Sequence, residues 1–225
     1  MIHIGIFGDS WSYQSFQKLP NFQESKGSNT FQSMFDKIGI NVSNYSQQSS
    51  SCQDIIDTIA KNNLSKFNTI VVFQTDPLRN IIDRKRFNPN IKFSGYSNII
   101  DIAESILLKF YQQLSQLEVP VTLVGGLSKI AHDLVPSNIA VLEKSWTELV
   151  DPDFTDCYFE WTDFTDLVCD YCGCNKNIEH IHHQIQAKNY IWQTSDAFGW
   201  CHPSDKGYDI MFDYLNTHLK KQGTL

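Results

Sequence analysis

Residues 2–10 read IHIGIFGDS, and this stretch decides the fold. An almost unbroken apolar run stops at a small polar turn, Gly8-Asp9-Ser10. An apolar run without alternation predicts a strand that is covered on both faces, as in a parallel sheet. Ligands bind at the carboxyl ends of such strands, so the turn is where chemistry is expected. Ser10 can act there as a nucleophile if a base lies beside it, or it can simply cap the following helix.

Similar apolar runs recur along the chain, at 38–44, 68–75 and 119–126, with a weaker one at 138–142. Helical patterns separate them, at 29–37, 53–61, 97–117 and 203–221. Alternating strands and helices imply right-handed crossovers. The sequence therefore predicts an α/β fold, a three-layer α/β/α sandwich around a mostly parallel sheet of about five strands.

The helical patterns also predict which faces are buried, because their apolar residues recur at helical spacing. Asn29 is the expected cap of the first helix, and Pro203 is expected in the first turn of the last. The predicted buried residues are Phe31, Met34 and Phe35 in the first helix, Ile99, Ile102, Ile106 and Phe110 in the third, and Ile210, Met211, Tyr214 and Leu215 in the last.

Composition narrows the function classes. The 225 residues are 41% hydrophobic, which is enough for a core, and the net charge is -7. Nucleic acids and anionic membranes bind basic surfaces, so neither is expected as a partner. No stretch approaches the roughly 20 apolar residues of a membrane span.

The amino terminus shows no signal-peptide pattern, which predicts a cytoplasmic protein. A phage-associated protein, or one released by lysis, would carry the same pattern. The 6 cysteines are too few for a disulfide scaffold. The sequence leaves the oligomeric state open.

Residues 150–195 break the strand–helix rhythm and are rich in Asp, aromatic residues, Cys and His. We interpret them as an insertion or lid within a single domain spanning residues 1–225. Thiolates and imidazoles are zinc ligands, but the spacing here differs from that of standard zinc sites. The prediction is therefore a lid with free thiols, with no metal and no other cofactor. The residues concerned are Cys169, Cys172, Cys174, His180, His182 and His183.

Near the other end, residues 201–208 read CHPSDKGY. G-D-S after an amino-terminal strand, combined with H-P-x-x-x-G-Y before the last helix, resembles the SGNH/GDSL hydrolase family. The resemblance covers the chain except for roughly 150–195, and it implies a flavodoxin-like fold. It also implies that Ser10 is the nucleophile and His202 its base, in the cleavage of a carboxylic ester through an acyl-enzyme.

The implied substrate is a small-molecule or carbohydrate ester, such as an acetyl group on a sugar. Two alternatives stay open on the same fold. One is a non-catalytic protein that binds a glycan or an acyl group. The other is an O-acyltransferase, which shares the acyl-enzyme step but passes the acyl group to a hydroxyl.

The oxyanion hole departs from the family pattern. The backbone N–H of Ser10 is one implied donor, and Ser49 stands where the family usually has a glycine whose N–H is another. The family's third block, G-x-N-D, corresponds to FQTDP at residues 73–77. An ionised Asp76 would repel an oxyanion, so Thr75 or Gln74 is favoured as the donor and Asp76 takes a structural role.

The triad acid departs as well. The family places it three residues before the histidine, where this chain has Gly199. Asp196 can reach the imidazole if the intervening loop folds back. Otherwise a backbone carbonyl can hold the correct tautomer, leaving a Ser–His dyad. Asp205 is interpreted as a charge of the helix first turn.

Other residues are predicted to lie around the cleft. Trp11 follows Ser10 in the sequence, and Trp200 lies two residues before His202. Both tryptophans are therefore expected to border the cleft, with Asp76 close by. Arg79 follows the third strand and can orient an anionic group of the substrate, or pair with a nearby Asp.

Overall fold

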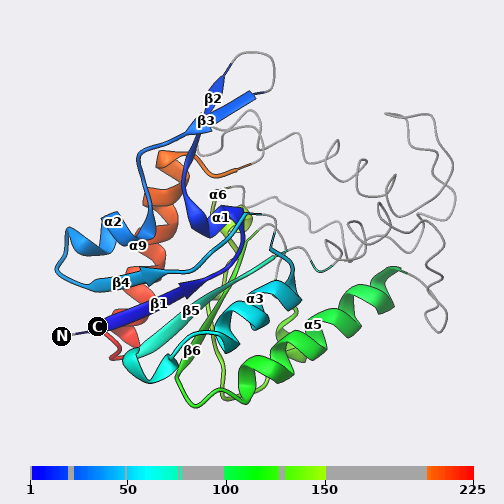
Figure 1. Ribbon diagram of the computed structural model, residues 1–225. Helices are drawn as coiled ribbons and strands as arrows, with labels where there is room; N and C mark the ends of the chain where they lie inside the picture. Colours follow the sequence, from blue (N-terminus) through cyan, green and yellow to red (C-terminus); the bar gives the residue numbers. More distant parts are fainter. Residues whose placement is uncertain are drawn as a thin grey trace, which may run out of the picture.

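The computed structural model describes residues 2–19, 23–48, 50–75, 77, 99–126, 130–150 and 202–225. Its main sheet has five parallel strands, in the order β4-β1-β5-β6-β7 (Figure 1). They are β1 (His3–Phe7), β4 (Asn41–Asn44), β5 (Thr69–Gln74), β6 (Val121–Gly125) and β7 (Ala140–Val141). The predicted parallel sheet is confirmed, and each of its strands falls within a predicted apolar run.

The strand order places a topological switch beside β1. Ile4 of β1 is in register with Val42 of β4 on one side and with Thr69 of β5 on the other. The chain therefore winds first in one direction and then in the other, the doubly wound order of flavodoxin-like folds. In such sheets the ligand site lies outside the carboxyl ends of the strands at the switch, here after Phe7 and Gln74.

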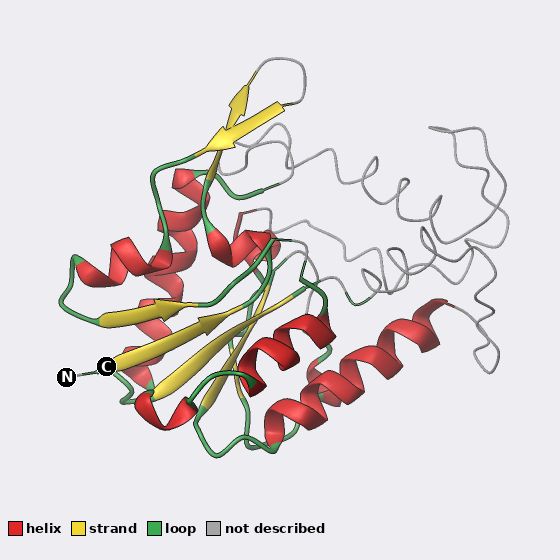
Figure 2. Cartoon of the chain, in the orientation of Figure 1, coloured by secondary structure: helices red, strands yellow, loops and turns green. Residues whose placement is uncertain are grey.

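Helices cover both faces of the sheet (Figure 2). One face packs against α2 (Phe31–Asp36), α6 (Trp146–Val150) and α9 (Asp205–Lys221), and the other against α3 (Cys52–Ala60) and α5 (Ile99–Ser115). Successive side chains of β5 point to opposite faces of the sheet and pack in both cores. Val71 and Phe73 belong to one core, and Ile70 and Val72 to the other. The predicted three-layer sandwich is confirmed.

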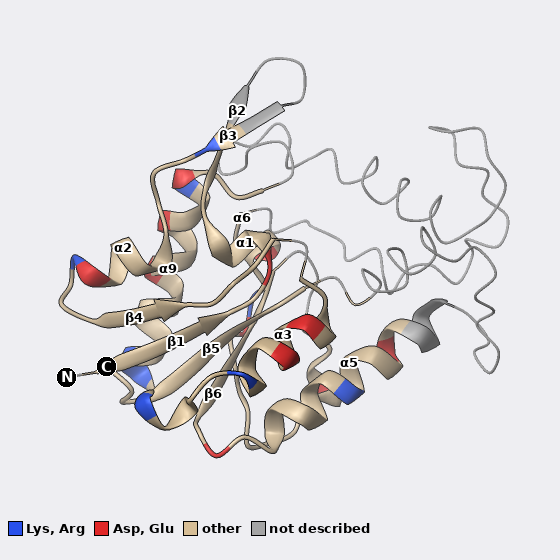
Figure 3. Cartoon of the chain, viewed as in Figure 1, with Lys and Arg blue, Asp and Glu red and all other residues tan. Residues whose placement is uncertain are grey.

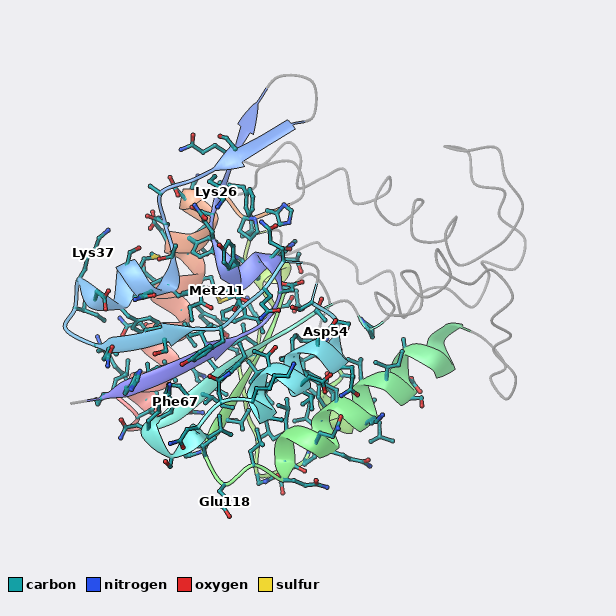
Figure 4. All side chains as sticks on the ribbon, in the orientation of Figure 1. Lys26, Lys37, Asp54, Phe67, Glu118 and Met211 are labelled. Atoms are coloured by element: carbon teal, nitrogen blue, oxygen red, sulfur yellow. The ribbon has the colours of Figure 1, made fainter. Side chains whose placement is uncertain are left out.

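Burial on both faces explains the composition of the strands. None of the five carries Lys, Arg, Asp or Glu. The charged residues coloured in Figure 3 lie on helices and loops and at the last residue of β3, at the base of the hairpin. Side chains fill the space between sheet and helices, with Met211 contributed by α9 on one side (Figure 4). A charge in these strands would lose its hydration without gaining a partner.

Side chains cap the amino-terminal ends of α2, α3 and α9. Thr30, not the expected Asn29, caps α2, because its Oγ1 accepts from the Ser33 N–H at 3.0 Å. Ser51 caps α3 through two reciprocal bonds: its side chain accepts from the Asp54 N–H, and the Asp54 side chain accepts from the Ser51 N–H. Ser204 caps α9, so Pro203 lies just before the helix rather than in its first turn.

The predicted buried faces are confirmed in α2 and shifted elsewhere. Phe31, Met34 and Phe35 are buried. In α5 the stripe runs through Leu107, Tyr111 and Leu114, together with Ala103 and Phe110, while Ile106 is only partly buried and the side chains of Ile99 and Ile102 lie outside the described residues. In α9, Met211 and Leu215 are buried, whereas Ile210 and Tyr214 pack at the margin of the core.

Several elements were not predicted. A two-stranded antiparallel hairpin, β2 (Phe16–Leu19) and β3 (Gln23–Lys26), projects beyond the main sheet (Figure 1). The short helix α1 (Ser10–Tyr13) precedes it. Two single turns, η2 (Leu64–Lys66) and η3 (His132–Leu134), complete the unpredicted elements in the described ranges together with α6.

The predicted insertion at 150–195, with its cysteines and histidines, lies outside the described residues from 151 onward. Within the described ranges, no helix is long and apolar enough to cross a bilayer. The same ranges hold no group of three His, Cys, Asp or Glu side chains placed to bind a metal ion.

Candidate active site

Ser10 and His202 meet across 192 positions of sequence, with His202 Nε2 3.0 Å from Ser10 Oγ. Ser10 is the first residue of α1, separated from the end of β1 by Gly8 and Asp9, and only 6% of it is exposed. For Ser10 to donate this hydrogen bond, the imidazole must carry its own proton on Nδ1. The distance lies within the range of a hydrogen bond between a serine hydroxyl and an imidazole.

Asp9 ties together the two strand ends at the topological switch. Its carboxylate is buried and accepts two hydrogen bonds, from the Trp11 N–H at 3.0 Å and from Thr75 Oγ1 at 2.9 Å. The first bond caps α1 and so sets the direction in which Ser10 leaves β1. The second joins the end of β1 to the residue after β5.

Gly8 is needed because the backbone has close neighbours there. A Cβ at this position would lie 2.1 Å from Ser12 Oγ and 2.8 Å from Phe73 Cβ. Any larger residue would push α1 away from β5. The three residues of the turn therefore have separate roles: Gly8 allows the close approach, Asp9 anchors the two strand ends, and Ser10 contacts His202.

Thr75 and Gln74, the two expected oxyanion donors, have other partners. The single hydroxyl proton of Thr75 is donated to Asp9, so it is not available to an oxyanion. Gln74 is 1% exposed, and its Oε1 accepts from the Tyr111 hydroxyl of α5. The Thr75 hydroxyl therefore supports the end of β5. Gln74 as a donor through Nε2 stays a prediction, because its bond with Tyr111 engages only the carbonyl oxygen.

The loop after β4 is held against α1. Asn44 donates through Nδ2 to the Ser12 carbonyl at 2.8 Å and accepts from the Ser46 N–H at 2.9 Å. Ser12 Oγ and Ser46 Oγ are 2.8 Å apart. These bonds bring residues 44–46 beside α1. Five predicted site residues lie outside the described residues: Ser49, Asp76, Arg79, Asp196 and Trp200.

The Gly207-Tyr208 pair joins α9 to α1 and α6. The Tyr208 hydroxyl donates to the Trp11 carbonyl at 2.5 Å, and Trp146 Nε1 donates to the Gly207 carbonyl at 2.9 Å. Burial, and then the charge of Asp9, raises the pKa of Tyr208 well above its ordinary value. The tyrosine therefore stays a neutral donor across the physiological range.

His202 is held from the other side by the start of the hairpin. The Phe16 ring lies 4.4 Å from the imidazole, centroid to centroid, at 30°. The Phe16 N–H donates to the Pro203 carbonyl at 2.9 Å. This contact could not be predicted from the sequence, because Phe16 stands in a short, mostly polar segment without a strand pattern.

Asp205 lies in the first turn of α9, as expected, and accepts hydrogen bonds from Ser15, Ser28 and Asn29. Burial alone would raise the pKa of its carboxyl group. The hydrogen bonds outweigh burial and lower that pKa below its ordinary value. Asp205 is therefore an anchor between α9 and the hairpin.

Trp11 differs from its predicted place. It is 3% exposed and packs edge-on against Trp146 in the core, with 6.0 Å between ring centroids. The exposed aromatic residue of α1 is Tyr13, at 37%. Lys26, the last residue of β3, is labelled in Figure 4. Its Nζ lies 5.9 Å from the Tyr13 ring centroid.

A scan against protein-family models and a search of curated proteins find no match to this chain. Among solved structures, the chain is similar to one described as a lipolytic protein of the G-D-S-L family from Desulfitobacterium hafniense. The identity is 11%, the TM-score is 0.48, and the match covers 97% of this chain and 100% of the other.

Two further structures are similar. The lipase/acylhydrolase from Enterococcus faecalis shares 14% identity at a TM-score of 0.45, over 99% of this chain and 97% of the other. The psychrotrophic esterase EstA from Pseudoalteromonas sp. shares 13% identity at a TM-score of 0.43, over 100% of both chains. These TM-scores lie below 0.5, so the fold and the site rest on this chain's own sheet order and contacts.

Proposed function

We propose that this protein is a serine hydrolase of the SGNH type that cleaves a carboxylic ester. The observation that carries the proposal is the 3.0 Å approach of His202 Nε2 to Ser10 Oγ. That approach lies at the switch point of a doubly wound sheet, where ligands bind in open α/β folds. Two segments from opposite ends of the chain thus supply a nucleophile and a base at one place.

In the proposed reaction, Ser10 Oγ attacks the acyl carbon while His202 Nε2 takes the hydroxyl proton. The imidazolium then gives that proton to the leaving alcohol, which leaves an acyl-enzyme on Ser10. Water attacks the acyl-enzyme in the second half, and its proton passes through His202 back to Ser10. The products are the free alcohol and the carboxylic acid, with the enzyme unchanged.

Two backbone N–H groups are proposed to hold the oxyanion, those of Ser10 and Ser49. Removing one good donor costs on the order of 100-fold in rate. Asp196, or a backbone carbonyl, is proposed to hold the Nδ1 proton of His202. Thr75 is left out of the hole, because its hydroxyl proton is donated to Asp9. Gln74 stays a proposed donor through its Nε2 amide group, since its bond with Tyr111 engages Oε1.

The proposed substrate is a small-molecule or carbohydrate ester, with a sugar acetate as the leading class. Tyr13 supports this proposal, because it is exposed on the helix that carries Ser10 and lies three positions along it. Positions three apart share one side of a helix, and aromatic faces stack on sugars and acyl groups. Trp200, Asp76 and Arg79 stay proposed as further neighbours of the substrate.

The test is hydrolysis of p-nitrophenyl acetate by the purified protein and four variants. Ser10→Ala and His202→Ala should each lower kcat by at least about 10⁴-fold, because the two residues act as one unit. The matched controls, Ser65→Ala and His132→Ala, change exposed residues of η2 and η3 and should keep the wild-type rate. Equal rates in all five proteins would contradict the proposal and favour a binding protein.

Hydrolysis is separated from transfer by product analysis with a sugar acceptor present. A hydrolase yields free acid in proportion to released p-nitrophenol. Acylated acceptor as the main product would identify a transferase instead.

A further inference from the structure

The base of the β2–β3 hairpin contacts the segment that carries His202 at three residues: His202, Pro203 and Asp205. We call residues 15–16 and 27–29 the hairpin root. The root closes on itself, because the Ser15 N–H donates to the Asn29 carbonyl at 2.9 Å and the Gly27 N–H donates to the Ser15 carbonyl at 2.8 Å. It begins two residues after α1, so it is directly connected to the helix that carries Ser10.

The carboxylate of Asp205 fills the centre of the root. Its Oδ1 accepts from Ser15 Oγ at 2.5 Å, from the Ser28 N–H at 3.0 Å and from the Asn29 N–H at 2.9 Å. Its Oδ2 accepts from Ser28 Oγ at 2.8 Å. Two backbone donors and two hydroxyls therefore converge on one side chain from α9.

The root has no spare room around this carboxylate. A Cβ on Gly27 would lie 2.4 Å from Ser15 Oγ and 2.8 Å from Asp205 Oδ1. The hairpin root leads directly into the β2–β3 ladder, in which Phe16 pairs with Lys26. The anchored root thus fixes the backbone at Phe16, whose ring covers the imidazole of His202 and whose N–H binds the Pro203 carbonyl.

We propose that Asp205 is a positioning residue for His202 and that it acts through the hairpin root and Phe16. The inference rests on the proposed function. His202 stands before the first turn of α9, outside the helical hydrogen-bond ladder, so its position must come from neighbours. Catalytic groups have to be held within about 0.5 Å of their productive geometry, and a displacement near 1 Å can cost on the order of 100-fold in rate.

The helix supplies a matched control. Asp209 lies one turn after Asp205 and also binds the root, but only the Asn29 side chain, at 3.0 Å. Asp205→Asn removes the charge and places amide hydrogens against donors of the root. Asp209→Asn removes a charge from the same helix and leaves the backbone of the root anchored.

The first experiment compares steady-state hydrolysis of p-nitrophenyl acetate by the two variants, at a temperature where circular dichroism shows both to be folded. Asp205→Asn should lower kcat by about 10- to 100-fold while KM stays within about twofold, because substrate contacts are kept. Asp209→Asn should keep both constants within about twofold. A lower melting temperature with an unchanged kcat in Asp205→Asn would assign it a structural role and overturn the proposal.

A double-mutant cycle tests the route through Phe16. If Asp205 acts through the ring contact, Phe16→Leu and Asp205→Asn should be non-additive, and the double variant should lose little more than the worse single variant. Effects on kcat that multiply would overturn this route. If Asp205→Asn does not fold, Ser28→Ala, which removes one bond to Oδ2, replaces it in the cycle with the same expectation.

The outcomes separate this inference from the proposed function. An active wild type with an equally active and folded Asp205→Asn variant overturns the inference alone. A wild type that hydrolyses no ester, and whose Ser10 does not react with a serine-directed probe, overturns both.

Discussion

At the scale of single residues, the roles of the residues in the turn Gly8-Asp9-Ser10 differ in how well the sequence predicts them. Ser10 is recognisable because a hydroxyl at the end of a buried strand is well placed for chemistry. Asp9 is not, because its role depends on Thr75, which lies 66 positions further on. The same applies to Thr75. The sequence shows a hydroxyl donor without its acceptor, and the structure shows that the acceptor is Asp9.

Thr75→Val tests that reassignment. The variant keeps the shape of the side chain but removes the hydroxyl donor from the buried Asp9. A hydrogen bond to a charged group contributes roughly 1.5–3 kcal/mol, so the free energy of unfolding should fall by about that amount in urea titration. The kcat for p-nitrophenyl acetate should fall by less than about tenfold. An unchanged stability with a loss of about 100-fold in kcat would instead make Thr75 an oxyanion donor.

Gly8→Ala tests the close approach of α1 to β5. The added Cβ would meet Ser12 Oγ at 2.1 Å, and overpacking of this kind costs about 1–3 kcal/mol. Chemical denaturation should show that loss, together with a lower kcat because Ser10 is displaced. Adding Ser12→Ala should restore part of the stability, since it removes the nearest atom. Wild-type stability in the single variant would show that the turn has room to spare.

At the scale of elements, the strands that could be predicted from the sequence are the ones rich in apolar residues. The five strands of the main sheet are apolar on both faces, and each lies within a predicted run. The hairpin was missed because its strands are four residues each and largely polar, FQKL and QESK. Its pairing depends on contacts with α9, which no local pattern records. The stripe of α5 was shifted toward Tyr111, because a polar hydroxyl there reaches Gln74 in the sheet.

The contact between the hairpin root and α9 predicts how the stability of the folded protein depends on pH. The hydrogen bonds from Ser15, Asn29 and Ser28 lower the pKa of Asp205 in the folded protein. The unfolded chain therefore takes up this proton at higher pH than the folded protein does. The stabilisation from Asp205 is fully present above the unfolded pKa, about 3.9, and is lost as the pH falls through the folded pKa.

The measurement is urea unfolding of the wild type and of Asp205→Asn between pH 7 and pH 3. The wild type should be the more stable at neutral pH, by a constant margin down to about pH 5. The margin should narrow below about pH 4. A margin that is independent of pH across the whole range would show that the charge of Asp205 plays no part in anchoring the hairpin.

At the scale of the whole molecule, the sheet order explains why distant segments form one site. The doubly wound order brings the carboxyl ends of β1 and β5 together, and α9 packs on the face that also holds α1 and α6. The sequence predicted this meeting of its two ends from the resemblance. It could not predict the supporting contacts, which join residues up to 197 positions apart.

The two cores should unfold together if residues 1–225 form one domain. Leu215 belongs to the core beneath α9 and Leu107 to the core beneath α5, and both are fully buried or nearly so. Leu215→Ala and Leu107→Ala should each cost about 2–5 kcal/mol. Each variant should still unfold in one transition, seen alike by circular dichroism and tryptophan fluorescence. Separate transitions would show that the faces are independent units.

The pairing of Ser10 with His202 is tested most directly by labelling with a fluorophosphonate probe and mapping the adduct by mass spectrometry. An activated serine should bear the phosphonyl group on the peptide that contains Ser10 within minutes. Labelling should slow by at least about 10³-fold in His202→Ala, because the base is gone. Labelling at another serine, or equal labelling of Ser10 with and without the imidazole, would contradict the account.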